Sequence, residues 1–563
     1  MSGFTKILFT VICCTTVYQS VTLEQPVVDT PYGRVAGTYL TSYSGRRFSQ
    51  FLSVPYAKPP VGELRFEEPQ RIEPWQGVWQ ANFSTVCAQL DHLIGGSING
   101  QEDCLYLNIY APQTDSNDPL DVIIDIHGGG FNFGSSTSYS GPHYLMDRDV
   151  VFVTVNYRLG IFGFLSTEDE VVPGNNGMKD QVMAIQWVND NIGYFGGNPN
   201  SITLTGLSAG GASVHLHFLS PLSKGLFKGG ISLSGNALCP WVFQDHPLQR
   251  AREVGSLVGC AQESTASLVS CLKQRSVTQV LEGVRPQHAW MYNPFSPFGI
   301  VAERHGRRPF LPDHPYELLR SGKVQDLPWI TSLVKHEGLY PVADFMNDDI
   351  LMELERRWNE LMPYIMHYSQ TVPIKSQADV SQKIKDFYFH GQPLSMGSFE
   401  NLIEIGSDRL FAVDAEKSLR LQASSNLSPT YYYYFTYESE KVFSFAEYFL
   451  KSDKRIGICH GDDLSFIFYN YHGLSKYTSK DEKMKNILLD IWTSFAKTGV
   501  PKVQGVEWKP VSRNAKSDIV YLDIRSPDEI QVREVSEMGH RSFWDSLGIQ
   551  ENENLFKSKK EEL

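Results

Sequence analysis

The stretch from Ser201 to Gly211 constrains the fold of this chain more than any other. Its first part is a short run of apolar and β-branched residues, which predicts a buried strand. The strand leads directly into a Gly-x-Ser-x-Gly motif centred on Ser208, and Ala209 to Phe218 are predicted to form a helix. The two glycines lack a Cβ, so strand and helix can pack closely around a strained serine turn. We therefore predict that Ser208 is a nucleophile, in preference to a serine in an ordinary glycine turn.

Other apolar runs predict the strands that would surround this turn. Between them lie helical patterns, and such alternation predicts an α/β fold with a large, mostly parallel sheet covered on both faces. Residues 27–108 alternate short strand-like runs with proline-rich turns, which predicts a small N-terminal antiparallel sheet. The predicted strands are Val122–Ile126, Val150–Val155, Ile202–Leu204, Gly230–Ser234, Trp329–Leu333 and Thr430–Tyr437, and the predicted helices include Met178–Ile192, Asp348–Tyr368, Ser381–Tyr388 and Lys483–Lys497.

The net charge excludes some classes of partner, and the terminal segments indicate a secretory protein. The formal net charge of −13 argues against nucleic acid or an anionic membrane as a partner. Residues 1–21 have the pattern of a signal peptide, and no later stretch is long and apolar enough to span a membrane. We expect one domain over residues 22–548 and a charged tail over 549–563. The final Lys560-Glu561-Glu562-Leu563 is either such a tail or a signal for an endoplasmic reticulum retrieval receptor.

Secretory entry makes disulfides and glycosylation possible. Six cysteines remain after the signal peptide, and their pairing cannot be chosen from the sequence alone. Asn82 and Asn426 begin glycosylation sequons, although Pro429 follows the second one.

The predicted nucleophile requires a base, and the base requires an acid to hold its tautomer. On a parallel sheet we expect the order serine, acid, histidine, each on a loop that follows a strand. Glu337 lies just past the strand Trp329–Leu333, and His460 lies in a polar turn well downstream. Taken separately, a surface glutamate and an ordinary loop histidine stay open as alternatives.

A glycine run, His127-Gly128-Gly129-Gly130, directly follows the predicted strand Val122–Ile126. Successive glycines let backbone N–H groups approach a negatively charged oxygen closely. The alternatives are a flexible loop or a phosphate cradle, but no Gly-Lys-Ser/Thr follows to hold a nucleotide. Its position at the end of a strand favours an oxyanion hole.

These motifs together resemble the type-B carboxylesterases, which include the cholinesterases. The resemblance extends from about Val27 to Leu547 and is greatest to insect esterases of the aphid resistance type. It implies the α/β-hydrolase fold and serine-dependent ester hydrolysis without a metal or cofactor. Besides the Ser208 motif, the matching residues are Glu102–Asn108, Asn156-Tyr157-Arg158, Asn175-Asn176-Gly177 and Asp180-Gln181.

The resemblance also implies specific roles for residues. Ser208 would be the nucleophile, Glu337 the acid and His460 the base, with Ser234 as a hydroxyl just behind them. The oxyanion N–H groups would come from Gly129, Gly130 and Ala209. Disulfides would join Cys87 to Cys104 and Cys260 to Cys271, leaving Cys239 and Cys459 free, and buried ion pairs would join Arg65 to Glu102 and Arg158 to Asp180.

Departures from the family pattern narrow the range of expected substrates. Cholinesterases carry glutamate where this chain has Leu207, and no tryptophan lies between Cys87 and Cys104, so a choline cation would lack its aromatic partner. We therefore expect uncharged, mainly aliphatic or xenobiotic esters as substrates, and organophosphates and carbamates as inhibitors. The alternatives are a juvenile hormone esterase, which typically has glutamine before the serine, and a neuroligin-like adhesion module. Pocket shape would depend on Phe131, Trp241, Phe295, Phe298 and Phe466.

Overall fold

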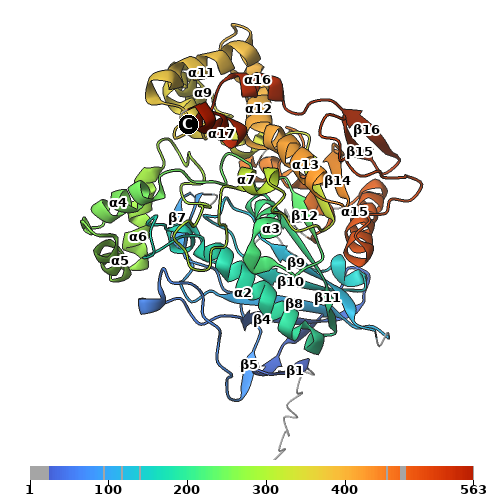
Figure 1. The fold of residues 1–563 in the computed structure, drawn as a ribbon. Helices are drawn as coiled ribbons and strands as arrows, with labels where there is room; N and C mark the ends of the chain where they lie inside the picture. The colour runs from blue at the N-terminus through green and yellow to red at the C-terminus, as the bar shows by residue number, and fades with distance from the viewer. Residues whose placement is uncertain are drawn as a thin grey trace, which may run out of the picture.

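A large twisted sheet runs through the molecule and is covered by helices on both faces (Figure 1). The computed structural model describes residues 25–92, 95–115, 118–137, 141–451, 454–469 and 477–561. The predicted signal peptide and the last two residues therefore lie outside the described residues. In the described parts of the chain, no helix has the length and apolar character needed to cross a membrane.

Within the described residues the large sheet has eleven strands, in the order β16-β15-β14-β13-β12-β11-β9-β10-β8-β4-β3. Pairing is parallel from β10 through β15, and antiparallel at both edges of the sheet. The predicted mostly parallel sheet is thus confirmed. Its strands are β3 (Thr38–Thr41), β4 (Arg47–Pro55), β8 (Tyr106–Pro112), β9 (Leu120–Ile126), β10 (Val150–Val155), β11 (Gly197–Leu207), β12 (Gly229–Leu233), β13 (Trp329–Val334), β14 (Thr430–Phe435), β15 (Ile519–Ser526) and β16 (Glu529–Val535).

Two small sheets lie apart from the large one. β1 (Val27–Thr30) pairs antiparallel with β2 (Gly33–Ala36), as expected for the N-terminal region. β2 also pairs with β5 (Val78–Gln80) in parallel, so this small sheet is mixed. β6 (Gln89–Asp91) and β7 (Ser97–Asn99) form an antiparallel pair.

Buried side chains of the central strands alternate between two hydrophobic clusters, one on each face of the sheet. Along β9, Val122 and Ile124 belong to one cluster and Ile123 to the other. Helices α2 and α3 contribute to the first cluster, and α15 contributes to the second through side chains such as Trp492. Burial on both faces explains why the central strands are continuous apolar runs and not alternating ones.

The helices largely occupy the predicted regions, with one exception. The predicted helix Asp348–Tyr368 is two helices, α9 and α10, because the backbone at Arg357 leaves helical geometry. The helices are α1 (Gly160–Phe164), α2 (Asn176–Asn191), α3 (Ala209–Leu219), α4 (Pro247–Leu257), α5 (Thr265–Lys273), α6 (Val277–Val284), α7 (Pro315–Arg320), α8 (Leu339–Val342), α9 (Asp348–Arg356), α10 (Trp358–Ile365), α11 (Ile374–Phe389), α12 (Phe399–Ser407), α13 (Val413–Ser425), α14 (Phe445–Leu450), α15 (Ser479–Thr498), α16 (Arg541–Ser546) and α17 (Asn552–Glu561).

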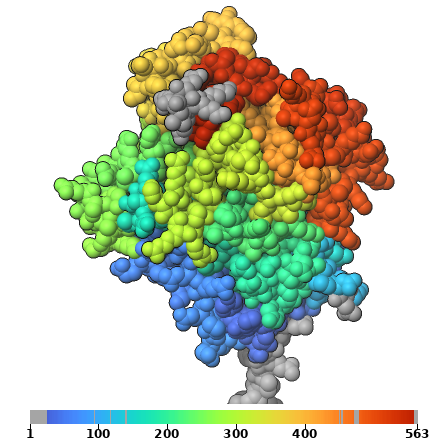
Figure 2. Space-filling view, viewed as in Figure 1, coloured from blue at the N-terminus to red at the C-terminus, as the bar shows by residue number. Residues whose placement is uncertain are grey.

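The C-terminal residues pack against the rest of the chain. In the space-filling view (Figure 2) they lie next to the yellow segment that contains α9 and α11. Ile549 and Asn552 are buried, so the first part of the predicted charged tail belongs to the folded body. Glu551 accepts hydrogen bonds at 2.5 and 2.9 Å from the buried guanidinium of Arg409. Arg409 lies in a π-helical turn, Asp408–Ala412, between α12 and α13.

The structure contains both implied disulfides and both implied ion pairs. Cys87–Cys104 and Cys260–Cys271 are bonded, whereas Cys239 and Cys459 are free and buried. Arg65 contacts Glu102 at 2.5 Å. Arg158 contacts Asp180 at 2.7 Å, with both side chains almost completely excluded from solvent.

Replacing Asp180 with asparagine is expected to lower the free energy of unfolding by about 3–5 kcal/mol, because Arg158 would keep a buried charge without its partner. Equilibrium unfolding in urea measures this effect. Asp379→Asn is the control, since Asp379 pairs with Lys383 on an exposed helix face and an exposed pair contributes about 0–1 kcal/mol. Equal effects of the two substitutions would contradict the prediction.

Candidate active site

The turn at Ser208 has the strained geometry that the sequence predicts. β11 ends at Leu207, α3 begins at Ala209, and Ser208 between them has φ of 60° and ψ of −121°. Such a backbone conformation is costly for any residue except glycine. Its N–H donates to the Leu233 carbonyl oxygen at 2.8 Å, which fixes the turn against the end of β12.

The two glycines of the motif are required by close packing. A Cβ on Gly210 would lie 1.9 Å from the Ile126 carbonyl oxygen, and one on Gly206 would lie 2.5 Å from the Gly210 carbonyl carbon. Real Cβ atoms do not approach other atoms so closely. Larger residues at either position would therefore push β11, α3 and β9 apart.

The sheet order brings the predicted acid to the same edge as the serine. β11, β12 and β13 are adjacent and parallel, so their carboxyl ends meet there. Ser208 follows β11, Ser234 follows β12 and Glu337 follows β13. Glu337 is buried, and its Oε1 accepts hydrogen bonds from Ser234 Oγ at 2.6 Å and from the Val334 N–H at 2.8 Å.

His460 completes the set of donors to Glu337. Its Nδ1 lies 2.6 Å from Glu337 Oε2, an arrangement in which Nδ1 carries the proton and Nε2 is left as an acceptor. Nε2 is buried, and it has no hydrogen-bond partner among the described residues. Within the described residues no hydrogen bond joins it to the Ser208 hydroxyl. Such contacts are often loose without substrate. The predicted acid and base are thus in direct contact. The serine is connected to the acid indirectly, because its N–H binds Leu233 and the next residue, Ser234, donates to Glu337.

The predicted oxyanion glycines pack directly against the serine turn. A Cβ on Gly128 would lie 2.7 Å from the Leu207 carbonyl oxygen and 3.1 Å from Ser208 Cβ. Gly129 and Gly130 have φ of 108° and 57°, which favour glycine. The Gly130 carbonyl oxygen accepts a hydrogen bond from Ser296 Oγ at 2.8 Å. In the described part of the chain the Gly129 and Gly130 N–H groups donate to no protein atom.

Two aromatic rings that the sequence analysis did not identify enclose the His460 imidazole. Tyr340 stacks on it with a centroid distance of 5.5 Å, and Phe411 packs at 4.8 Å. Tyr340 lies only three residues after Glu337, and this short spacing could have indicated from the sequence that it lies near the site. Phe411 comes from the π-helical turn, so its position depends on tertiary structure.

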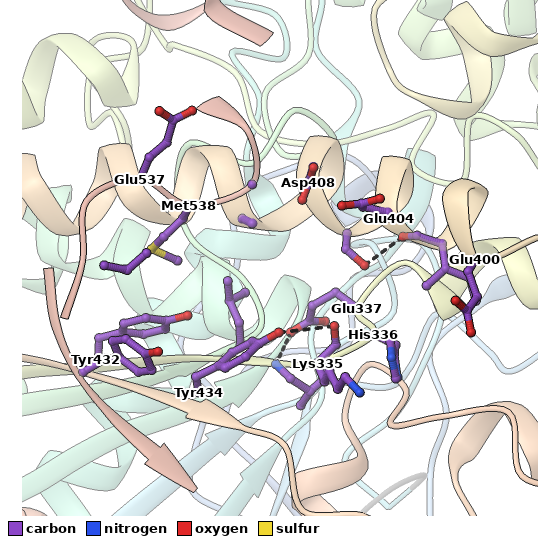
Figure 3. Close-up of a pocket in the computed structure, with 18 of the residues that line it drawn as sticks. Lys335, His336, Glu337, Glu400, Glu404, Asp408, Tyr432, Tyr434, Glu537 and Met538 are labelled. Carbon is purple, nitrogen blue, oxygen red and sulfur yellow. Dashed lines mark hydrogen bonds between the residues drawn. The ribbon is translucent and has the colours of Figure 1, made fainter. Parts of the chain in front are cut away.

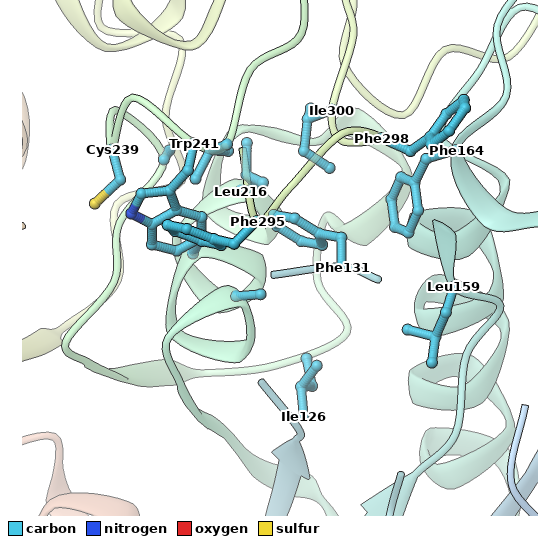
Figure 4. Close-up of a cluster of buried hydrophobic side chains, with 14 of the residues drawn as sticks. Ile126, Phe131, Leu159, Phe164, Leu216, Cys239, Trp241, Phe295, Phe298 and Ile300 are labelled. Carbon is cyan, nitrogen blue, oxygen red and sulfur yellow. The ribbon is translucent and has the colours of Figure 1, made fainter. Parts of the chain in front are cut away.

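Four of the five predicted pocket aromatics cluster near the glycine run (Figure 4). Phe131, Trp241, Phe295 and Phe298 are buried in the same cluster, and a Cβ on Gly130 would lie 3.2 Å from the Phe295 ring. The prediction for Phe466 is wrong. Its ring packs on Phe435 and Tyr437 in the cluster on the opposite face of the sheet.

Comparison with known proteins identifies the family. The model of the carboxylesterase family matches residues 24–544. The chain belongs to the carboxylesterase family. Venom carboxylesterase-6 of Apis mellifera is 41% identical over 538 residues, which cover 94% of this chain and 95% of that protein. Esterase FE4 of Myzus persicae is 38% identical over 529 residues, which cover 92% of each.

A solved structure gives the same result for the fold. The crystal structure of juvenile hormone esterase from Manduca sexta, with OTFP covalently attached, matches with a TM-score of 0.81 and 29% identity. The match covers 93% of this chain and 99% of that chain. The predicted α/β-hydrolase fold is confirmed, and this carboxylesterase is a carboxylic ester hydrolase. The alternative of a non-enzymatic adhesion module is therefore set aside.

A cavity of this carboxylesterase, of about 720 Å³, lies behind Glu337 (Figure 3). Glu337 and His336 form part of its wall, but Ser208 and His460 do not. At its edge, ligand atoms of Glu404, Asp408 and His540 lie within 4.8 Å of one another. Asp408 Oδ2 already accepts hydrogen bonds from His540 Nδ1 and the Tyr388 hydroxyl, both at 2.7 Å, so we infer no metal site from this cluster.

The two glycosylation sequons of the carboxylesterase differ in accessibility. Asn82 is exposed. Asn426 is 1% exposed, and its Nδ2 donates to the Gln325 carbonyl oxygen at 3.1 Å. A glycan on that nitrogen would break this contact and displace the packing around it. The side chain of Asn82 is therefore accessible from solvent, whereas that of Asn426 is enclosed.

Replacing Ser234 with alanine is expected to lower kcat for a p-nitrophenyl ester about tenfold, with KM little changed. The substitution removes one of three donors to the buried Glu337 carboxylate, and a hydrogen bond to a charged group contributes about 1.5–3 kcal/mol. Steady-state kinetics measures the effect. Ser424→Ala, an exposed serine bonded only to a nearby carbonyl, is the control. An unchanged kcat in the Ser234 variant would show that this hydroxyl is dispensable.

Proposed function

We propose that Ser208, Glu337 and His460 form the catalytic triad of this carboxylesterase. The observation that carries the proposal is the 2.6 Å contact between Glu337 and His460 beside the serine turn. Glu337 orients the imidazole and stabilises its charged form, so that Nε2 can accept a proton. Ser208 has the strained, glycine-flanked position of an activated nucleophile.

Catalysis then proceeds in two acyl-transfer steps. Ser208 Oγ attacks the ester carbonyl carbon while His460 Nε2 takes the hydroxyl proton. The resulting oxyanion is held by the N–H groups of Gly129, Gly130 and Ala209. His460 gives its proton to the leaving alcohol, which departs as the C–O ester bond breaks. A water molecule, deprotonated by His460, attacks the acyl-enzyme. The bond between the acyl carbon and Ser208 Oγ then breaks, His460 returns the proton to Ser208, and the carboxylic acid product leaves.

We propose that the substrates are uncharged esters with aliphatic or xenobiotic groups. Four buried aromatic side chains beside the glycine run support this proposal, because they offer an apolar acyl environment. Leu207, which precedes the proposed nucleophile, is also apolar and buried. Juvenile hormone esterase is the second candidate function, favoured by the structural match to that enzyme from Manduca sexta.

We propose that a signal peptide over 1–21 is removed and that the protein acts in the secretory pathway as one domain, which buried Ile549 and Asn552 extend beyond the expected limit at residue 548. Two disulfides support an oxidising compartment. Retention in the endoplasmic reticulum lumen would require a receptor that accepts Glu561 in place of aspartate in the retrieval signal. Without such a receptor the protein is secreted.

The Ser208→Ala variant tests the proposed nucleophile. We expect it to lose at least about 1,000-fold in kcat for a p-nitrophenyl ester, because the covalent route is removed. It should also fail to react with a fluorophosphonate probe, whose tetrahedral phosphorus resembles the intermediate. Gel fluorescence reports labelling, and a correctly folded variant that turns over or labels like the wild type would refute the assignment.

A matched pair of substrates tests the expected preference for uncharged esters. Acetylcholine and its carbon isostere 3,3-dimethylbutyl acetate have nearly the same shape and differ in charge. We expect kcat/KM to be at least about tenfold higher for the uncharged ester, because a desolvated ammonium without a cation–π partner forgoes about 2 kcal/mol. Product release under matched conditions measures both values, and a preference for acetylcholine would contradict the proposal.

A further inference from the structure

The residue that precedes the proposed acid connects the loops of the acid and the base. The His336 N–H donates to the Ile458 carbonyl oxygen at 3.0 Å. In return, the Ile458 N–H donates to His336 Nδ1, also at 3.0 Å. His336 and Cys459 form a parallel bridge pair. The backbone and the side chain of His336 thus both bind Ile458, which lies two positions before His460.

The base loop is shaped to receive this imidazole. Gly457 has φ of 127°, and a Cβ on it would lie 2.4 Å from His336 Nδ1. A residue with a side chain at position 457 would collide with the ring. The contact between His336 and the loop is therefore close along the whole segment that leads to His460.

The His336 imidazole is neutral at pH 7. Burial, together with the charge of nearby Lys335, lowers the pKa of His336 to about 4, and Glu400 partly opposes this shift. Nδ1 must be unprotonated to accept the Ile458 N–H, so the proton of the neutral ring lies on Nε2. The ring is thus a fixed acceptor for the base loop.

The far side of the base loop has a separate anchor. Asp462 Oδ2 accepts the Cys459 N–H at 2.6 Å, and its Oδ1 accepts the Phe445 N–H at 2.7 Å. His460 lies between these two attachments. Only the attachment through His336 connects directly to the acid, because Glu337 is the next residue.

We propose that His336 is a positioning residue, which aligns the base loop with the acid loop so that His460 Nδ1 meets Glu337 Oε2. The proposal rests on the proposed triad and adds a residue to it. His336 does not itself serve as the base: its Nδ1 is occupied, and its ring borders the cavity behind Glu337, which Ser208 does not line (Figure 3).

Three substitutions at position 336 test the proposal. In His336→Asn the amide oxygen can replace Nδ1 as acceptor, whereas in His336→Gln the amide is one carbon too far, and His336→Ala has no acceptor. We expect kcat to fall about tenfold or more in the alanine and glutamine variants, with KM within about twofold. The asparagine variant should retain most of the wild-type kcat.

The pH profile gives a readout that loss of stability alone would not change. Contact with the Glu337 carboxylate stabilises the imidazolium form of His460, and a weakened contact removes part of this stabilisation. The acid limb of kcat/KM is therefore expected to move to lower pH in the alanine and glutamine variants. In the asparagine variant it should stay in place.

Control variants distinguish a failure of the His336 proposal from a failure of the proposed triad. His305→Ala, at an exposed histidine, should behave like the wild type, and thermal unfolding shows whether each variant is folded. Wild-type kcat and pH profile in both the alanine and glutamine variants would overturn the inference, as would an asparagine variant as impaired as alanine. Activity in Ser208→Ala would instead overturn the triad.

Discussion

A buried carboxylate must be surrounded by donors, and Glu337 meets this requirement with groups from three parts of the chain. Val334 is the last residue of β13, Ser234 follows the neighbouring strand, and His460 comes from a loop more than a hundred residues downstream. None of these donors is close in sequence to the Ser208 turn. The parallel order of β11, β12 and β13 brings the serine turn to the same edge. The geometry of the site is therefore a property of the sheet.

Much of this sheet could be predicted from the sequence because its central strands are buried on both faces. Val150–Val155 is a continuous apolar run, and the structure has a strand with the same limits. β11 (Gly197–Leu207) extends beyond the predicted Ile202–Leu204 at both ends. Its polar beginning pairs with β9 only through Gly197 before a register shift, and its last residues run into the glycine motif, so neither end has the apolar pattern of the middle. The parallel β2–β5 pair also had no local signal, since it joins segments far apart in the chain.

The candidate site was predictable only where a local motif defines it. The turn around Ser208 and the glycine run have signatures of adjacent residues, and both have the expected backbone geometry. Glu337 and His460 could be paired only through the resemblance to a family, because nothing local connects them. Phe411 and Phe466 show that residue type alone does not predict which aromatic side chains lie at the site. Both are buried aromatics, yet one contacts His460 and the other lies across the sheet. Which face a side chain occupies is decided by packing.

The π-helical turn between α12 and α13 links two distant parts of the molecule. Arg409 binds Glu551 near the end of the chain, and Phe411, two residues later, rests on the imidazole of His460. An extra residue in a helix of this kind rotates the side chains that follow it. The contact with Glu551 and the contact with His460 therefore begin from residues two positions apart on a single helical turn, so the segment after α16 and the candidate site share one support.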